Sequence, residues 1–164
     1  MALGLVAGSG LFAESALAQQ GAAGPEWRSY GGDTGSTKYS PLDQIDRGNL
    51  ADLRIAWQWE SVDGRFDLDQ LREDYPNLQV PNDISAVRIS NLKATPLMAG
   101  GVLYISPPLS QIAAIEPTTG ETLWVNDPRS YASGIPTMML GFSNRGLAYW
   151  TDGDLERLIM GTGD

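Results

Sequence analysis

The sequence predicts an all-β fold, part of a β-propeller, and two observations carry this prediction. The first is an apolar strand that ends at Pro117 and turns through residues 118–120 into a strand carrying Trp124, four positions after Gly120. The second is a series of four short segments rich in apolar and β-branched residues, at 94–98, 102–106, 111–116 and 121–126. Four consecutive antiparallel strands form one propeller blade, so these segments predict one complete blade.

The turn before Trp124 has a clear physical basis. Pro117 has no amide hydrogen to donate to a strand ladder, so it ends the incoming strand. Gly120 can adopt the positive φ angle that a tight hairpin turn requires. Trp124 then has a fixed place on the outgoing strand, where its flat indole can cover the turn of a neighbouring sheet. A single hairpin with a buried tryptophan is the alternative interpretation of this segment alone.

A second blade is predicted after the first. Residues 146–150 and 157–161 read as two strands joined by a turn at 151–154. The chain stops at Asp164 within this blade. We therefore expect only about one and a half blades of a ring that needs several, and hence a fragment of a larger protein.

The segment before the first blade is less regular. Residues 26–48 are rich in Gly, Ser, Thr and Asp, which predicts coil, whereas residues 54–60 alternate like a strand. Residues 61–90 are interpreted as an insertion loop with a short helix at 67–74. The acidic residues of this loop lack the spacing of a calcium-binding loop, so no metal site is predicted there.

The first residues read as a targeting signal. Residues 3–13 are apolar and are followed by an Ala-x-Ala cleavage pattern at 16–18, but the first charged side chain is Glu14 where a signal peptide begins with Lys or Arg. We interpret residues 1–18 as the remnant of a signal peptide and 19–25 as a flexible tail, the alternative being a disordered tail. The expected location is periplasmic, with any membrane association made through parts not present in this chain.

Composition excludes several classes of function. The 164 residues carry a formal net charge of −9, which argues against nucleic acid as a partner because such binding needs a cationic surface. The chain contains no His and no Cys, which excludes a His-based catalytic triad, a thiolate metal site and a disulfide within it.

Several strings resemble, in the same order, the pyrroloquinoline-quinone (PQQ) dependent dehydrogenases, which are eight-bladed propellers. The matching strings lie at 26–33, 38–45, 49–57, 113–124 and 144–150. The resemblance covers most of residues 26–164 and implies that the segment at 49–57 ends in an outer strand that helps to close the ring. It also implies the N-terminal portion of a periplasmic enzyme that oxidises a sugar, polyol or alcohol hydroxyl and passes electrons to a quinone or cytochrome.

The resemblance implies two cofactor-binding residues. Arg145 matches the family's arginine that pairs with a PQQ carboxylate, and a guanidinium suits this role because it donates a planar fork. Lys93 stands where the family places Glu or Gln, and its charge could neutralise another carboxylate. The alternatives are an arginine paired with Asp152 or Asp154, and a solvated lysine at the start of a strand.

A second departure concerns the covering of the cofactor ring. Alcohol-oxidising members carry two adjacent cysteines shortly before the Asn-Arg-Gly string, whereas this chain has residues 139–142, Met-Leu-Gly-Phe. The resemblance then favours the glucose and polyol branch, with an aliphatic or thioether surface over the ring. Filling of a loop core is the alternative role of these side chains.

No catalytic residue is assigned, because the resemblance places the family's catalytic Asp and the Ca²⁺ ligands beyond the position of Asp164. Two other interpretations compete with the enzyme. One is a non-catalytic propeller with the same repeats, acting as a periplasmic or outer-membrane assembly scaffold. Such scaffolds are usually lipoproteins with a Cys at the cleavage site, and there is no Cys here. The other is a small secreted β domain, which would leave the strand at 157–161 with an open edge.

Overall fold

The computed structural model describes residues 21–65, 67–74, 76, 92–133 and 142–162. Within these residues the helical elements are three 3₁₀ turns and one short α-helix: η1 Leu50–Asp52, η2 Val62–Arg65, η3 Ser130–Ser133 and α1 Leu68–Asp74. The strands are β1 Leu97–Ala99, β2 Val102–Ile105, β3 Ile112–Ile115, β4 Thr122–Asn126, β5 Ala148–Thr151 and β6 Glu156–Ile159. The short helix predicted at 67–74 is confirmed as α1.

Strands β1 to β4 form one antiparallel sheet in the order β1-β2-β3-β4, which confirms the predicted blade. The first strand begins at Leu97 and not at residue 94, because Pro96 has no amide hydrogen to donate to a ladder. Thr95 instead forms an isolated parallel bridge with Gly146. Strands β5 and β6 form a separate antiparallel hairpin, as predicted for the start of a second blade.

The turn between β3 and β4 has the predicted geometry. Gly120 has a φ of 75°, and its N–H donates to the carbonyl oxygen of Glu116 at 2.9 Å. The Glu116 carboxylate accepts from the N–H groups of Thr118 and Thr119, at 2.8 and 2.6 Å. Hydrogen bonds between the Glu116 carboxylate and the two threonines therefore stabilise the turn.

Trp57, from the N-terminal segment, covers this turn. A Cβ atom at Gly120 would lie 2.6 Å from the Trp57 ring, so only glycine fits beneath the indole. The Trp57 Nε1–H donates to the carbonyl oxygen of Pro117 at 2.9 Å. The sequence predicted that Trp124 would cover a turn of this kind with its indole. On this turn the covering indole is that of Trp57.

Trp124 lies on β4 with 44% of its surface exposed. Its ring centroid is 5.9 Å from that of Tyr104, and both rings line a groove together with Tyr149 and Leu158 of the β5–β6 hairpin. Trp124 therefore faces the second hairpin. Its contact with the turn of a further sheet stays a prediction.

The prediction of a strand at 54–60 is wrong, because these residues form no strand in the structure. A strand needs a ladder partner, and this segment has none among the described residues. Its tryptophan side chains pack instead on one face of the first sheet, against Ile105, Ala113 and Ile115. Trp59 adds a hydrogen bond from Nε1 to the Thr122 hydroxyl at 2.9 Å.

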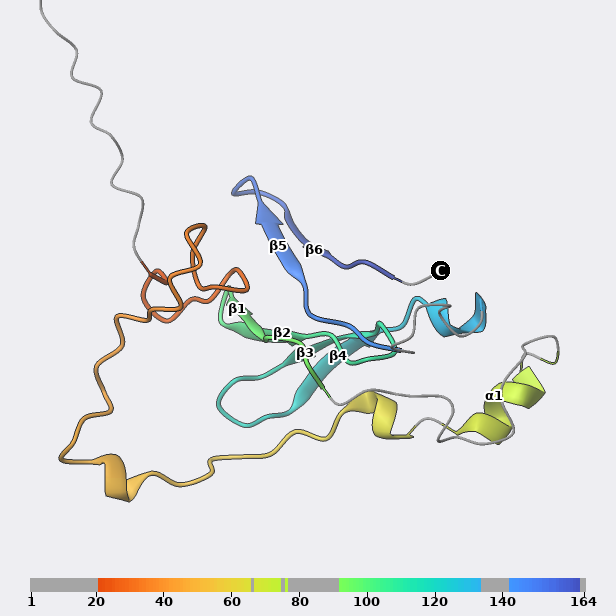
Figure 1. Ribbon diagram of the computed structural model, residues 1–164, viewed down its shortest axis with the longest axis horizontal. Helices are drawn as coiled ribbons and strands as arrows, with labels where there is room; N and C mark the ends of the chain where they lie inside the picture. Colours follow the sequence, from red (N-terminus) through yellow and green to blue (C-terminus); the bar gives the residue numbers. More distant parts are fainter. Residues whose placement is uncertain (1–20, 66, 75, 77–91, 134–141, 163–164) are drawn as a thin grey trace, which may run out of the picture.

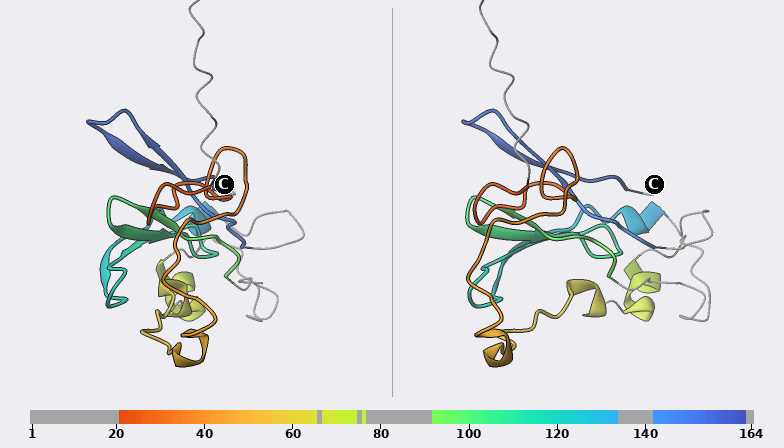
Figure 2. Two further views of the ribbon diagram at one scale, coloured as in Figure 1. Left: turned by 90° about the vertical axis from the view of Figure 1, so that its left-hand side faces the viewer. Right: turned by 60° about the vertical axis from the view of Figure 1, so that its left-hand side comes forward.

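The opposite face of the first sheet packs against the β5–β6 hairpin. Leu97 and Ile112 of the sheet and Leu147 before β5 form a buried cluster, which Tyr149 and Leu158 extend. Figures 1 and 2 show the hairpin on one side of the four-stranded sheet and the segment around residues 50–60 on the other. Strands β1 to β3 are therefore covered on both faces, whereas every residue of β4 is exposed.

The β3–β4 turn should make stability depend on pH. The Thr118 hydroxyl and the turn's N–H groups lower the pKa of Glu116 below its ordinary value. Stability from this carboxylate is present above about pH 4 and is lost as the pH falls through the lowered pKa. We expect Glu116→Gln to flatten the loss of stability in acid, as measured by urea denaturation from pH 6 to about pH 3. Glu60→Gln, at an exposed glutamate outside the turn, serves as the control. Equal loss of stability in acid in the wild type and in Glu116→Gln would contradict this prediction.

Candidate functional site: a cleft with two cations

A cleft of about 660 Å³ lies where the segments leading into β1 and β5 meet. This volume is in the range of small-molecule sites. Its described lining combines two cations, an aromatic ring and small or polar residues: Tyr30, Lys93, Thr95, Asn144, Arg145, Gly146, Leu147 and Gly161. The structure thus brings Lys93 and Arg145, 52 positions apart in sequence (145 − 93), into one cleft.

A backbone bridge places the two cations together. Thr95 and Gly146 form an isolated parallel bridge, and Lys93 and Arg145 lie close to these residues in the two bridged segments. Gly146 has a φ of 137°, and a Cβ atom there would lie 3.5 Å from the Thr95 carbonyl oxygen. The backbone conformation therefore favours glycine at this position, whereas a Cβ atom would make only an ordinary contact with Thr95.

Asn144 is the residue of this site that sequence reasoning missed. Its side chain is 5% exposed. Its Oδ1 accepts from the N–H of Gly146 at 2.8 Å, and its Nδ2 donates to the carbonyl oxygen of Gly161 at 3.3 Å. The Asn-x-Gly string is a turn signal in which the side chain binds the backbone two residues on, and that signal could have identified the first of these bonds.

Neither cation is neutralised within the described part of the chain. Both Lys93 and Arg145 are exposed, and neither forms an ion pair with a described residue. Asp152, an alternative partner for Arg145, accepts from the N–H groups of Leu155 and Asp154 in its own turn. These backbone bonds, Leu155's first, lower the pKa of Asp152.

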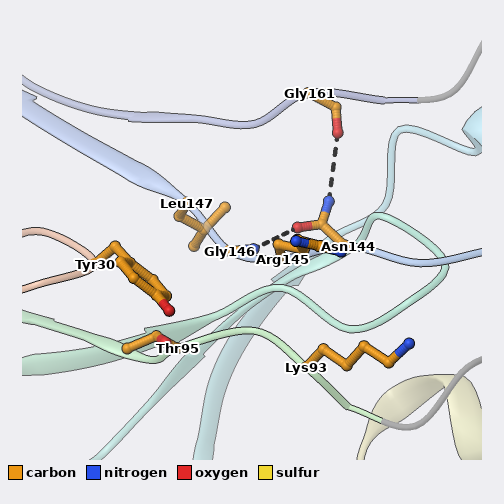
Figure 3. A pocket seen from close by; sticks show the side chains of 8 residues that line it. All are labelled: Tyr30, Lys93, Thr95, Asn144, Arg145, Gly146, Leu147 and Gly161. Carbon is orange, nitrogen blue, oxygen red and sulfur yellow. Dashed lines mark hydrogen bonds between the residues drawn. The ribbon is translucent and has the colours of Figure 1, made fainter.

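The cleft is positive although the chain is acidic. The chain carries a formal net charge of −9, yet none of the described residues lining the cleft is Asp or Glu. Its cations can therefore offer charge and hydrogen-bond donors to an anionic ligand. In the view of Figure 3, Lys93 and Arg145 lie toward one end of the cleft and Tyr30 toward the other.

Tyr30 comes from the N-terminal segment, and this segment is anchored in two ways. Trp27 exchanges backbone hydrogen bonds with Met98 of β1, at 2.8 and 3.0 Å. The Asp33 carboxylate accepts from the N–H of Thr37 at 2.9 Å, and this bond lowers the pKa of Asp33. The Lys38 ammonium lies 5.6 Å from the centre of the Tyr30 ring, which adds a further cation beside the cleft lining.

One prediction about this region is not addressed by the structure. Residues 139–141, expected to cover a cofactor ring, lie outside the described residues, and only Phe142 of that string is described, with 6% exposure. The part of the chain that the structure describes has no cluster of three or more potential acidic metal ligands. The described helices are all too short or too polar to cross a lipid bilayer.

The fold and the cleft together define a class of protein: part of a β-propeller, with one four-stranded blade, a hairpin that begins a second blade, and a cationic cleft where the two meet. The particular family follows from sequence. Residues 27–164 match the family described as PQQ: Glucose/ethanol/alcohol dehydrogenase, beta-propeller domain. The chain belongs to this family, which confirms the recognition made from the sequence strings.

Relatives of two kinds are similar to this chain. It is 32% identical over 151 residues to the quinohemoprotein alcohol dehydrogenase ADH IIB of Pseudomonas putida, covering 92% of this chain and 18% of that protein. It is 31% identical over 116 residues to quinoprotein glucose dehydrogenase A of Acinetobacter calcoaceticus, covering 71% of this chain and 12% of that one.

A solved structure agrees with this assignment. The quinohemoprotein alcohol dehydrogenase of Comamonas testosteroni superimposes with a TM-score of 0.50 at 27% identity, over 85% of this chain and 18% of that one. The chain thus spans less than a fifth of the length of these relatives.

Proposed function

We propose that this chain is the N-terminal portion of a PQQ-dependent dehydrogenase that oxidises the hydroxyl group of an alcohol, sugar or polyol. Electrons would pass to a quinone or a cytochrome, and the signal-like residues 1–18 support a periplasmic location. The observation that carries the proposal is the cationic cleft, which Lys93 and Arg145 both line without acidic partners in the described chain.

The cleft residues fit the chemistry of PQQ, a flat tricyclic molecule with three carboxylates. Arg145 can donate a planar, charge-assisted fork to one carboxylate. Lys93 supplies a mobile point charge for another. Tyr30 and Leu147 offer aromatic and aliphatic surface to a flat ring. When bound, PQQ supplies the redox chemistry by accepting two electrons from the carbon that bears the substrate hydroxyl.

The substrate branch is part of the proposal. Alcohol and glucose dehydrogenases both occur among the similar proteins. The glucose and polyol branch is favoured by residues 139–142, which lack the adjacent cysteines of the alcohol-oxidising members. The family resemblance places the residues that would hold Ca²⁺ beyond the position of Asp164.

The proposal is tested by titrating PQQ into the full-length apo-protein and following both binding heat and dye-linked oxidation of ethanol, glucose and a polyol. We expect binding near one PQQ per chain, whereas a scaffold propeller would bind none. Lys93→Gln should weaken PQQ binding about fivefold, because an exposed charge contributes only about 1 kcal/mol. Arg47→Gln, outside the cleft lining, serves as the charge-matched control. No binding by the wild type would rule out the proposed function.

A further inference from the structure

We propose that Asn144 is a positioning residue that holds Arg145 in the orientation needed to receive the anionic cofactor. This inference rests on the proposed function, because it concerns how the same cleft binds PQQ. It assigns to Asn144, whose side-chain amide is bonded to the backbone, a role that it performs through its neighbour Arg145.

The first step is the chemistry of the two groups that Asn144 joins. One is an N–H donor, on Gly146, and the other is a carbonyl acceptor, on Gly161. An amide side chain supplies an acceptor and a donor at once. A carboxylate would accept from Gly146 but would face the Gly161 carbonyl with a second acceptor. Because the side chain is 5% exposed, water cannot readily replace either bond.

The second step is the effect on Arg145. Its preceding residue is fixed by the buried amide, and its following residue is fixed by the hydrogen bond to Asn144 and by the bridge to Thr95. The backbone is therefore held on both sides of Arg145, while the guanidinium keeps no ion-pair partner among the described residues. A charged residue whose backbone is already fixed loses less conformational freedom when a ligand binds.

The third step is that the anchor of Asn144 is itself held. Gly161 follows Met160, whose sulfur accepts a hydrogen bond from the Ser106 hydroxyl at 3.0 Å. Ser106 is completely buried at the end of β2. The first sheet thus holds the segment that follows β6. This segment holds Asn144, and Asn144 holds the segment that carries Arg145, through the two hydrogen bonds drawn in Figure 3.

The test compares PQQ affinity and stability in the full-length apo-protein. We expect Asn144→Ala to weaken PQQ binding about tenfold, the size expected for loss of one positioning contact. Asn144→Ser should recover part of this loss, because a serine hydroxyl can accept from the N–H two residues on but cannot reach Gly161. Binding is measured by calorimetry, and the apo-protein melting temperature is measured in parallel.

A matched control is available in the N-terminal segment. Asn49 also joins two backbone groups, accepting from the N–H of Asp46 at 2.9 Å and donating to the carbonyl of Gln44 at 2.7 Å. It is not among the residues that line the cleft. Asn49→Ala should therefore leave PQQ affinity unchanged. If Asn144→Ala does not fold, Asn144→Ser carries the comparison.

A double mutant separates positioning from general stability. In an Arg145→Ala background, Asn144→Ala should change PQQ affinity by less than about twofold, because residues that act through one contact are not additive. Equal affinity in wild type and Asn144→Ala, or an undiminished effect in the Arg145→Ala background, would overturn the inference while leaving the proposed function intact. Failure of the wild type to bind PQQ would overturn both.

Discussion

Replacing Trp57 by alanine is expected to lower the free energy of unfolding of the full-length protein by about 3 to 5 kcal/mol. The indole lies directly over Gly120 and packs on the sheet face formed by Ile105, Ala113 and Ile115. Its removal would expose that face, leave a cavity above the turn, and deprive the Pro117 carbonyl of its donor. Equilibrium denaturation in urea, with the same probe for every variant, measures the loss.

Two further variants divide the Trp57 effect into its parts. Trp57→Phe keeps a ring over Gly120 but loses the Nε1–H donor, and it should cost about 1 kcal/mol for the hydrogen bond plus a smaller packing loss. Trp59→Phe removes a donor from an exposed hydrogen bond to Thr122 and should cost less. A Trp57→Ala variant as stable as Trp59→Phe would show that the contact over the turn does not stabilise the protein.

Replacing Arg145 by alanine is expected to weaken PQQ binding about a hundredfold, or about 3 kcal/mol. Once PQQ occupies the cleft, a carboxylate deprived of its guanidinium is left desolvated and unpaired, and this is the main source of the loss. The melting temperature of the apo-protein should hardly change, because Arg145 is exposed and makes no described ion pair. Calorimetric titration and thermal melting of the same samples measure both quantities.

Arg145→Lys is the informative companion variant. An ammonium keeps the positive charge but not the planar fork, so it should recover only part of the lost affinity. If Arg145→Ala binds PQQ as tightly as the wild type does, this arginine is a surface residue and does not belong to the cofactor site. A fall in the apo-protein melting temperature as large as the loss of affinity would point to a structural role.

The first sheet was predictable because its signals are local. Both the segments of apolar and β-branched residues and the turn at Gly120 act within a few positions. The sequence also indicated that Arg145 and Lys93 serve one ligand, but only through family resemblance. Their closeness depends on the Thr95–Gly146 bridge, a long-range contact that no local pattern reveals.

The wrong strand prediction has a physical origin. The alternation at 54–60 is a true strand pattern, but the backbone has no ladder partner in the described chain, and the side chains pack on a sheet face instead. The contact of Trp124 with the turn of a further sheet stays a prediction, whereas the described β3–β4 turn is covered by Trp57. A local pattern indicates the kind of contact that such residues make, but it does not name a partner that lies far away in sequence, as Trp57 does from the turn it covers.

The contact of Trp57 with the Pro117 turn has a consequence for the order of folding. It closes 60 residues of chain, and the entropy of such a closure is lost before the contact is formed, whereas the β3–β4 hairpin closes through a short turn. The hairpin should therefore form early and the N-terminal segment should dock late, onto a turn that already exists. Trp57→Ala would then accelerate unfolding far more than it slows refolding, so that this tryptophan sets the lifetime of the folded state.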